Sequence, residues 1–291
     1  MNSKIPEFSF YFLKEQTRNY DKTELITLLT SNPNVSGPLD ENNKKIYVYH
    51  HPLLNFEAKF VMSEIAVVPD ADQINPKYLD VDFYVSFSVL LSNYAIELVL
   101  DMVEEICKRF QFFVYNQAFQ YTVMPFRRPI MVKAFTSWKK AFASKYPEKV
   151  ATFNFLDSQT LSQVYNYLLK RKRIELTLDK EKINVTNYIF LRTESSRSAY
   201  VAIKWDGKQS FILPPCVDLL MVDDGKGVKK YPMLEILKHT DKLFKPIDGY
   251  GDIMLLEAKY VKKFLKIITK EKYPPLAHEV KPTMLEQILD V

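Results

Sequence analysis

"VDFYVSFSVLLSNYAIELVLDMVEEICKRF", residues 81–110, joins the clearest strand pattern of the chain to its clearest helix pattern. In the first part apolar and polar residues alternate, as in a strand that buries one face. In the second part apolar residues recur three and four positions apart, opposite acidic residues, which predicts an amphipathic helix. The expected core is Val81, Phe83, Val85, Phe87 and Val89 from the strand, and Ile96, Val99, Leu100, Val103 and Ile106 from the helix.

Shorter patterns on either side complete a first unit around this stretch. Residues 8–13, 45–51 and 56–65 alternate like strands, residues 21–29 read as a short helix, and residues 112–116 read as a last strand. The element order is therefore β-α-β-β-β-α-β. This order predicts an antiparallel-rich sheet with two helices on one face.

The rest of the chain predicts a second unit of mixed structure. Helices are expected at residues 129–146, 157–173, 232–244 and 259–270, with strands between them and a hairpin turn at Asp206-Gly207. Residues 116–129 lack clear periodicity and hold two prolines, so we place a boundary there. The fold class that follows is α+β with two mixed modules, an acidic domain at 1–122 and a basic domain at 123–291 that ends in a C-terminal tail.

The first helix of the second unit combines apolar and basic residues. Met131, Phe135, Trp138 and Phe142 recur at helical spacing and predict a buried stripe. The lysines Lys133, Lys139, Lys140 and Lys145 are then expected mostly on the solvated side.

The two halves of the chain differ in charge. Residues 1–124 carry 10 basic and 16 acidic residues, whereas residues 125–291 carry 30 basic and 19 acidic residues. Such a split favours a basic half that binds an acidic partner. It equally allows the two halves to face each other, so that the partner is internal.

Arg127 and Arg128 are the first candidates for anion binding. They begin a helix, where the positive end of the helix dipole makes a cation unfavourable. Something negative should therefore lie beside them. We expect carboxylates of the acidic half or plain solvent, and keep a bound anion at the helix end as the alternative.

Two further clusters of basic residues lie in the second half. Lys170, Arg171, Lys172 and Arg173 are expected at a helix C-terminus, where cations are favoured without any ligand, and a nucleic-acid or localisation patch is the alternative. Lys259, Lys262, Lys263, Lys266 and Lys270 share one face of a helix. A basic amphipathic helix of this kind can lie on anionic lipid or phosphate, or can bury its apolar face and leave its lysines in water.

One catalytic possibility overlaps the last cluster. Asp252, an apolar strand, and then Glu257-Ala258-Lys259 is an arrangement in which two carboxylates hold Mg²⁺ and a lysine orients the attacking water. Over these few residues it resembles the PD-(D/E)XK nuclease pattern, although no Pro-Asp pair precedes the strand. The resemblance implies metal ligands at Asp252 and Glu257 and a water-orienting base at Lys259. The alternative is that Glu257 is a first-turn residue favoured by the helix dipole.

Several classes of function are disfavoured by composition. Only six glycines occur, and none has the spacing of a phosphate-binding loop. The four histidines have no ligand spacing, and Cys107 and Cys216 imply no disulfide framework. No cofactor and no metal are therefore expected. The sequence also lacks a transmembrane run and a signal-peptide pattern, so we expect a cytoplasmic protein.

These observations favour a soluble, non-catalytic protein-interaction module, with another protein as its partner. Its surface would be the acidic half or the C-terminal tail, which we expect more often to dock on its own protein than to enter a partner's groove. The alternative is a nucleic-acid-associated protein that uses the basic half, with the Mg²⁺-dependent nuclease as its catalytic variant.

Overall fold

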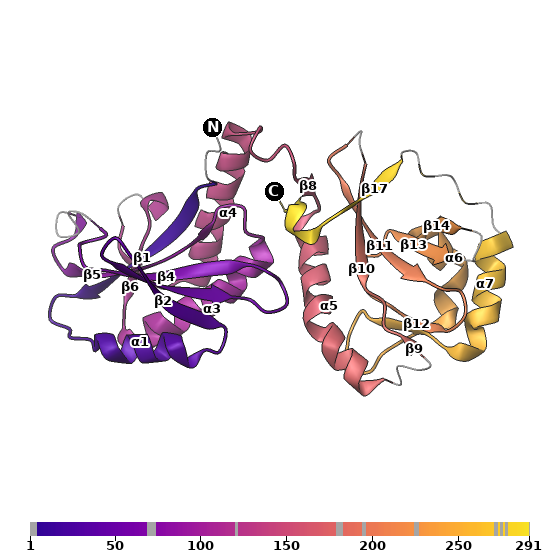
Figure 1. Ribbon diagram of the computed structural model, residues 1–291, viewed down its shortest axis with the longest axis horizontal. Helices are drawn as coiled ribbons and strands as arrows, with labels where there is room; N and C mark the ends of the chain where they lie inside the picture. The colour runs from indigo at the N-terminus through magenta and orange to yellow at the C-terminus, as the bar shows by residue number, and fades with distance from the viewer. Residues whose placement is uncertain are drawn as a thin grey trace. The chain divides into compact units, whose positions relative to one another are not determined.

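The computed structural model divides the chain into two compact units, one that runs to Ala151 and one from Thr152 to Asp290, and each is described by itself (Figure 1). The structure describes residues 5–68, 74–119, 122–178, 183–193, 196–223, 227–270, 273, 276 and 279–290. The division lies later than the boundary expected after residue 122. The reason is that helix α4 (Arg128–Lys145) packs on the first unit, where Phe135 contacts the rings of Phe8 and Phe87.

The first unit is built on one seven-stranded antiparallel sheet with the order β2-β3-β4-β5-β1-β6-β7. Its strands are β1 Glu7–Glu15, β2 Val35–Glu41, β3 Lys44–His50, β4 Glu57–Ser63, β5 Tyr78–Ser88, β6 Phe113–Tyr115 and β7 Met124–Pro125. The predicted α+β class is confirmed, but the predicted order β-α-β-β-β-α-β lacked two strands of this sheet, β2 and the two-residue β7. Strand β2, VSGPLDE, contains glycine and proline and is mostly exposed, so it has no alternation to detect.

Three helices lie on one face of this sheet. Helices α1 (Lys22–Ser31) and α3 (Asn93–Phe110) lie side by side below the sheet in Figure 1, joined by an ion pair of 2.8 Å between Arg109 and Glu24. Helix α4 joins them through the Phe135 contacts. All ten core residues predicted for β5 and α3 are buried. Because inward residues of β5 alternate with Tyr84 and Ser86, those two point to the opposite face.

The buried stripe of α4 differs from the prediction at one turn. Met131, Phe135 and Phe142 are buried as expected, but Trp138 is 42% exposed and Lys139 is fully buried. The ammonium group of Lys139 donates to the carbonyl oxygen of Leu91 at 3.2 Å and to the side-chain oxygen of Asn93 at 2.7 Å. A buried lysine is tolerated here because these oxygens replace the water that it loses.

The second unit contains two larger sheets and a two-stranded one. Their orders are β14-β13-β11-β10-β17, β15-β16-β12-β9 and β18-β8. The strands are β8 Asn154–Phe155, β9 Ile183–Asn184, β10 Tyr188–Thr193, β11 Ala199–Trp205, β12 Ser210–Leu213, β13 Leu219–Asp223, β14 Val228–Pro232, β15 Phe244–Pro246, β16 Met254–Leu256, β17 Val280–Thr283 and β18 Ile288–Leu289. The Asp206-Gly207 turn does not form the predicted hairpin, because β11 and β12 belong to different sheets.

Helices α5 (Ser158–Thr177), α6 (Met233–Thr240) and α7 (Val261–Lys270) complete the second unit. Figure 1 shows α5 and α7 on opposite sides of the strands. The described part of the C-terminal tail docks on its own unit, as expected, because β17 pairs with β10 and β18 pairs with β8. Between β17 and β18 the tail forms a single 3-10 turn at Leu285–Gln287.

The edges of the three larger sheets share one property. Five of their six edge strands contain a proline: Pro38 in β2, Pro125 in β7, Pro232 in β14, Pro246 in β15 and Pro282 in β17. The sixth, β9, has only two residues. Proline offers no backbone N–H to a further strand, so these edges are protected against pairing with another chain.

Candidate binding surfaces

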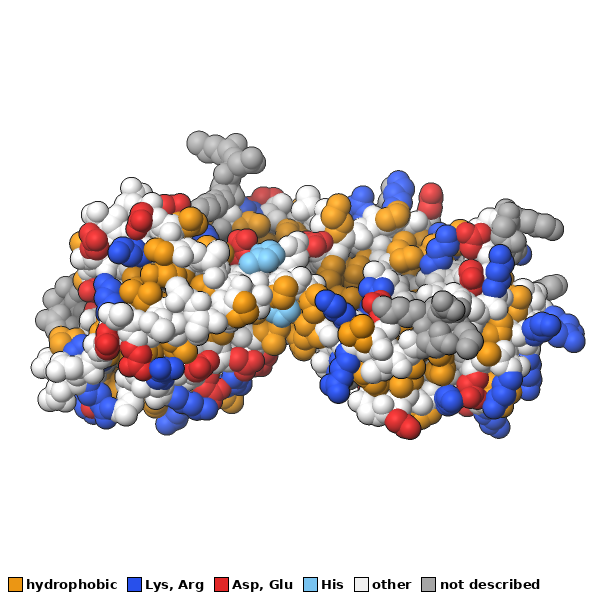
Figure 2. Space-filling model, turned by 60° about the horizontal axis from the view of Figure 1, so that its bottom comes forward, with side chains coloured by type: hydrophobic (Ala, Val, Ile, Leu, Met, Phe, Trp, Pro, Cys, Tyr) orange, Lys and Arg blue, Asp and Glu red, His pale blue; other side chains and the backbone are white. Residues whose placement is uncertain are grey.

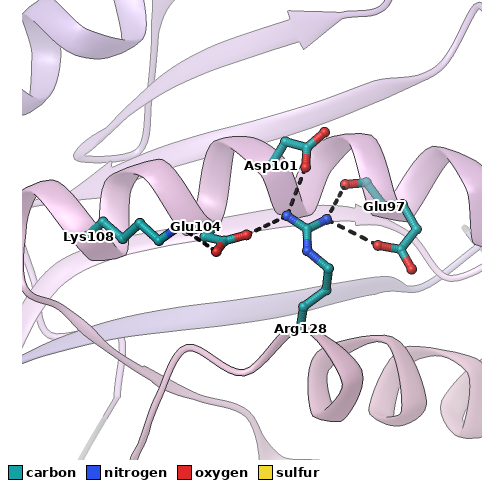
Figure 3. A network of polar contacts seen from close by, with 5 residues as sticks. All are labelled: Glu97, Asp101, Glu104, Lys108 and Arg128. Carbon is teal, nitrogen blue, oxygen red and sulfur yellow. Dashed lines mark hydrogen bonds and ion pairs between the residues drawn. The ribbon is translucent and has the colours of Figure 1, made fainter.

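Arg128 is held by the acidic helix of its own unit (Figure 3). Its guanidinium donates to the Glu97 carboxylate at 3.1 Å, to Asp101 at 2.8 Å and to Glu104 at 2.6 Å. Lys108 pairs with the second oxygen of Glu104 at 2.7 Å. The structure therefore places carboxylates of the acidic helix beside Arg128, which is the first of the explanations that the sequence left open.

The electrostatics of this network follow from its geometry. The hydrogen bonds from Lys108 and Arg128 hold the pKa of Glu104 below its ordinary value. Burial disfavours the charge of Arg128, but its three carboxylate partners raise the pKa of the guanidinium above its ordinary value. Both groups therefore stay charged at neutral pH, and the arginine has no role left as a free anion site.

The charge difference between the two parts becomes smaller when the chain is divided at Ala151, because the net charges are then 0 and +5 instead of −6 and +11. Residues 1–151 carry 17 basic and 17 acidic residues, and residues 152–291 carry 23 and 18. The segment that changes the balance includes α4, whose Arg128 meets the acidic residues of α3. Arg127 is exposed and makes no ion pair with any described residue, and its side chain does not cap α4.

The run from Lys170 to Arg173 lies inside α5 and not at its C-terminus. The helix continues to Thr177, and its last turn contains no basic residue. Arg171 pairs with Glu175 at 2.6 Å, whereas Lys170, Lys172 and Arg173 are exposed. The prediction that these cations lie at the C-terminal end of the helix, where the helix dipole favours them, is therefore wrong.

Of the three residues of the nuclease pattern, the structure pairs Glu257 with Lys259. Asp252 precedes β16 and Glu257 follows it, and Glu257 pairs with Lys245 at 2.8 Å and with Lys259 at 3.1 Å. These two lysines hold the pKa of Glu257 below its ordinary value. Within the described ranges, no group of three or more His, Cys, Asp or Glu side chains is placed to hold a metal ion. The geometry gives the metal site no support.

Asp252 and Lys170 instead line one small pocket of about 100 Å³. The other walls come from Asn166 and Tyr167 of α5 and from the loop around Tyr250. Both charged residues are exposed to solvent. The sequence singled out these two residues for different reasons and gave no signal that they meet.

The lysines of α7 lie together on its outer side, as predicted. Lys262, Lys263, Lys266 and Lys270 are exposed, while Val261, Phe264 and Ile268 are buried. Figure 1 places α7 and α5, the helices that carry the two basic clusters, on opposite sides of the strands of the second unit. The two basic clusters of this unit do not form one surface.

The face of the first sheet opposite its three helices is a surface that the sequence did not identify. One end of it is covered where Val68 packs with Leu13, Tyr78 and Tyr115. The rest carries two cross-strand rows, which we call the tyrosine face: Leu39, Ile46, Val61, Tyr84 and Tyr11, and beside them Ser36, Val48, Lys59, Ser86 and Ser9. Tyr11 and Tyr84 are half-buried, with ring centroids 5.5 Å apart, and Tyr11 also packs against the Val68 cluster. Val61 and Ser86, in the middle of the two rows, are only 2% and 1% exposed.

The tyrosine face is close to neutral. Its Lys59 pairs with Glu7 at 2.6 Å, and the hydroxyl of Ser86 donates to the other Glu7 oxygen at 2.9 Å. Burial raises the pKa of Tyr11, so this phenol stays protonated at neutral pH. Alternation in β5 already pointed Tyr84 and Ser86 away from the core, but strand pairing was needed to bring them beside β1.

Cysteine and histidine supply no further reactive centre in the described parts of the chain. Burial raises the pKa of the Cys107 thiol and also that of Cys216, which lies against the side chain of Gln163. Nδ1 of His51 accepts hydrogen bonds from the backbone of Leu53 and Leu54, and burial lowers the pKa of this imidazole.

Comparisons with protein families, with curated proteins and with solved structures find no match to this chain. Among the described helices, none is long and apolar enough to cross a membrane. The function therefore has to be argued from the surfaces themselves.

Proposed function

We propose that this chain is a non-catalytic protein-interaction module that binds a partner protein through the tyrosine face. The observation that carries the proposal is the row from Leu39 to Tyr11, which crosses five neighbouring strands on the face opposite α1, α3 and α4. Within this row Leu39 is exposed and Ile46 and Tyr84 are half-buried, whereas Val61 is buried and Tyr11 packs against the Val68 cluster. Leu39 is 54% exposed at one end of this row. Tyrosine offers a large contact area with few rotatable bonds, and aromatic residues are enriched at protein interfaces.

Charge supports a protein over a nucleic acid as the occupant of this face. The phosphate backbone of a nucleic acid is bound by unpaired cations. Lys59, in contrast, already forms an ion pair with Glu7, and Lys44 lies over the Tyr84 ring, 5.7 Å from its centroid. A neutral surface with tyrosine, serine and aliphatic side chains is complementary to an uncharged, partly apolar protein surface.

The protected edges support binding through a face. A partner strand that extends a sheet needs free N–H and C=O groups along an edge. Pro38 and Pro125 stand in the two edge strands of the first sheet. Side chains of the tyrosine face, and not the backbone of an edge, would then determine the partner.

The test is affinity purification with the whole chain as bait, after nuclease treatment, followed by binding measurements with the purified partner. We expect Tyr84→Ala with Leu39→Asp to weaken binding at least about tenfold, as for central interface residues. Glu105→Lys, on the exposed helix side, is the matched control and should bind like wild type. Equal binding by all three proteins, or no protein retained after nuclease treatment, would exclude the tyrosine face as the binding surface.

The nucleic-acid alternative has less support from the described residues. Arg128 is engaged by carboxylates and Arg171 is paired with Glu175. The α5 and α7 cations lie on helices at opposite sides of the strands of the second unit (Figure 1).

A further inference from the structure

We propose that the lysine face of α7 binds peripherally to a membrane surface that contains anionic phospholipid. We define the lysine face as Lys262, Lys263, Lys266 and Lys270. It is a second surface, separate from the tyrosine face, and its test does not depend on the protein partner.

The apolar side of α7 fixes the direction of the lysine face. Phe264 is fully buried, with ring centroids 5.5 Å from Trp205, 5.9 Å from Phe211 and 5.4 Å from Phe244. The helix therefore cannot turn its lysines inward without losing this aromatic cluster. Side chains of lysine and arginine are accordingly prominent at the right-hand end of Figure 2, which is the end where Figure 1 places α7.

Among the described residues, several other lysines have carboxylate partners that the lysines of this face do not have. Lys59 pairs with Glu7 at 2.6 Å, Lys204 with Asp223 at 3.0 Å and Lys238 with Glu235 at 2.7 Å. For the four members of the lysine face, the described residues provide no carboxylate within ion-pair distance. The described acidic residue next to them is Glu257, which is already shared by Lys245 and Lys259.

The spacing of these lysines destabilises the helix that carries them. Lys262 and Lys266 are four residues apart, as are Lys266 and Lys270, and like charges at this spacing repel. A solvated helix with no ligand would be more stable with acidic residues interspersed. An anionic partner removes the repulsion, so the pattern is explained by binding.

Further lysines extend the positive surface around α7. Lys259 and Lys245 are mostly exposed at the start of the helix, with side-chain exposures of 64% and 54%. Lys208 is exposed in the loop where Gly207 lies against Leu265 of α7. These residues add exposed positive charge near the lysine face at the α7 side of the second unit.

The chemistry of this surface favours phospholipid over nucleic acid. It contains lysine and no arginine, so it lacks the planar group that binds base edges with two hydrogen bonds. Tyr260 is the aromatic residue beside it, and its ring is already covered by Lys259 at 4.9 Å. Flexible ammonium groups on a convex helix can all reach a flat layer of headgroup phosphates, where each contributes to adsorption. Because the apolar face of α7 is buried, no insertion is expected.

The experiment is sedimentation of the whole chain with vesicles of phosphatidylcholine, with and without phosphatidylserine, over a range of salt. We expect binding only with phosphatidylserine, decreasing as salt rises. Lys262→Gln with Lys263→Gln and Lys266→Gln should weaken it by about a hundredfold, since each lysine contributes about 1 kcal/mol near an anionic surface. The matched control, with the same charge change on α5, is Lys170→Gln with Lys172→Gln and Arg173→Gln. It should bind like wild type.

Two results would overturn the proposal. The first is an absence of vesicle binding, or binding that the α7 variant leaves unchanged while circular dichroism shows both variants folded. The second comes from labelled single- and double-stranded oligonucleotides tested at the same salt. If these bind as tightly as the vesicles and lose binding in the α7 variant, the lysine face is a general polyanion or nucleic-acid site. Loss of vesicle binding would leave the tyrosine-face test unaffected, since the two use different surfaces.

Discussion

Arg128 of α4 binds the acidic side chains of α3, so one basic residue of the second half of the sequence becomes part of the first unit. Its side chain is 31% exposed and lies between three carboxylates from successive turns of α3. Without this arginine, Glu97, Asp101 and Glu104 would face one another with Lys108 as their nearest described cation. The network therefore joins α4 to α3, in addition to the packing of Phe135 against the sheet.

Replacing Arg128 with Met should lower the free energy of unfolding by roughly 1–2 kcal/mol, because charge-assisted hydrogen bonds are lost and carboxylate repulsion remains. Urea denaturation measures this loss. The loss should shrink at high ionic strength, since salt screens exposed charges. Arg127→Met is the control, because that neighbour makes no ion pair with any described residue. An equal loss in both variants would contradict a specific network.

The same pair of proteins should respond differently to acid. The pKa of Glu104 is lowered in the folded state, first by Lys108 and then by Arg128, from an ordinary value of 4.5. A carboxylate whose pKa is lowered by folding stabilises the folded state at pH values above its unfolded pKa. This stabilisation is lost as the pH falls through the pKa of the folded state. The free energy of unfolding of wild type should therefore exceed that of Arg128→Met by the full amount at neutral pH. This difference should decrease as the pH falls below the ordinary pKa of 4.5. Unfolding measured across this range checks it, and a constant difference would argue against the ion pairs.

At the scale of elements, the periodicity of the sequence predicted the features that depend only on residues close in sequence, such as which face of a strand or helix is buried. β5 and α3 have the expected cores, and the lysine face of α7 follows from helical spacing alone. The exchange of Trp138 and Lys139 on α4 could not be predicted, because the oxygens that receive the buried ammonium come from residues 91 and 93. The tyrosine face was equally hidden, since it forms only when β1 pairs with β5 across about seventy residues.

The lysine face leads to a prediction about α7 as an element. Lys266→Glu replaces two repulsive pairs, with Lys262 and with Lys270, by two attractive ones. We expect the free energy of unfolding to rise by about 1 kcal/mol at low salt, while binding to anionic vesicles weakens. Urea denaturation and vesicle sedimentation of the same preparation measure both effects. A variant that loses stability would show that the lysines of α7 are not in conflict with one another.

At the scale of the whole molecule, each compact unit contains one tryptophan. Trp138 lies 42% exposed on α4, and Trp205 is fully buried between Phe211 and Phe264 in the second unit. The expected boundary after residue 122 would have placed both in one domain. The observed division at Ala151 instead makes Trp205 a reporter of the second unit alone.

This placement allows a test of whether the two units unfold independently. In a Trp138→Phe background, Phe264→Ala should lower the stability reported by Trp205 by about 3–5 kcal/mol, as for other buried aromatic residues. Arg128→Met acts in the first unit, so it should leave the Trp205 transition where it was, and the double variant should match Phe264→Ala. The measurement is tryptophan fluorescence during urea unfolding. If Arg128→Met moved the Trp205 transition, the two units would unfold as one cooperative body. The division at Ala151 would then separate two packed units that are not independently stable.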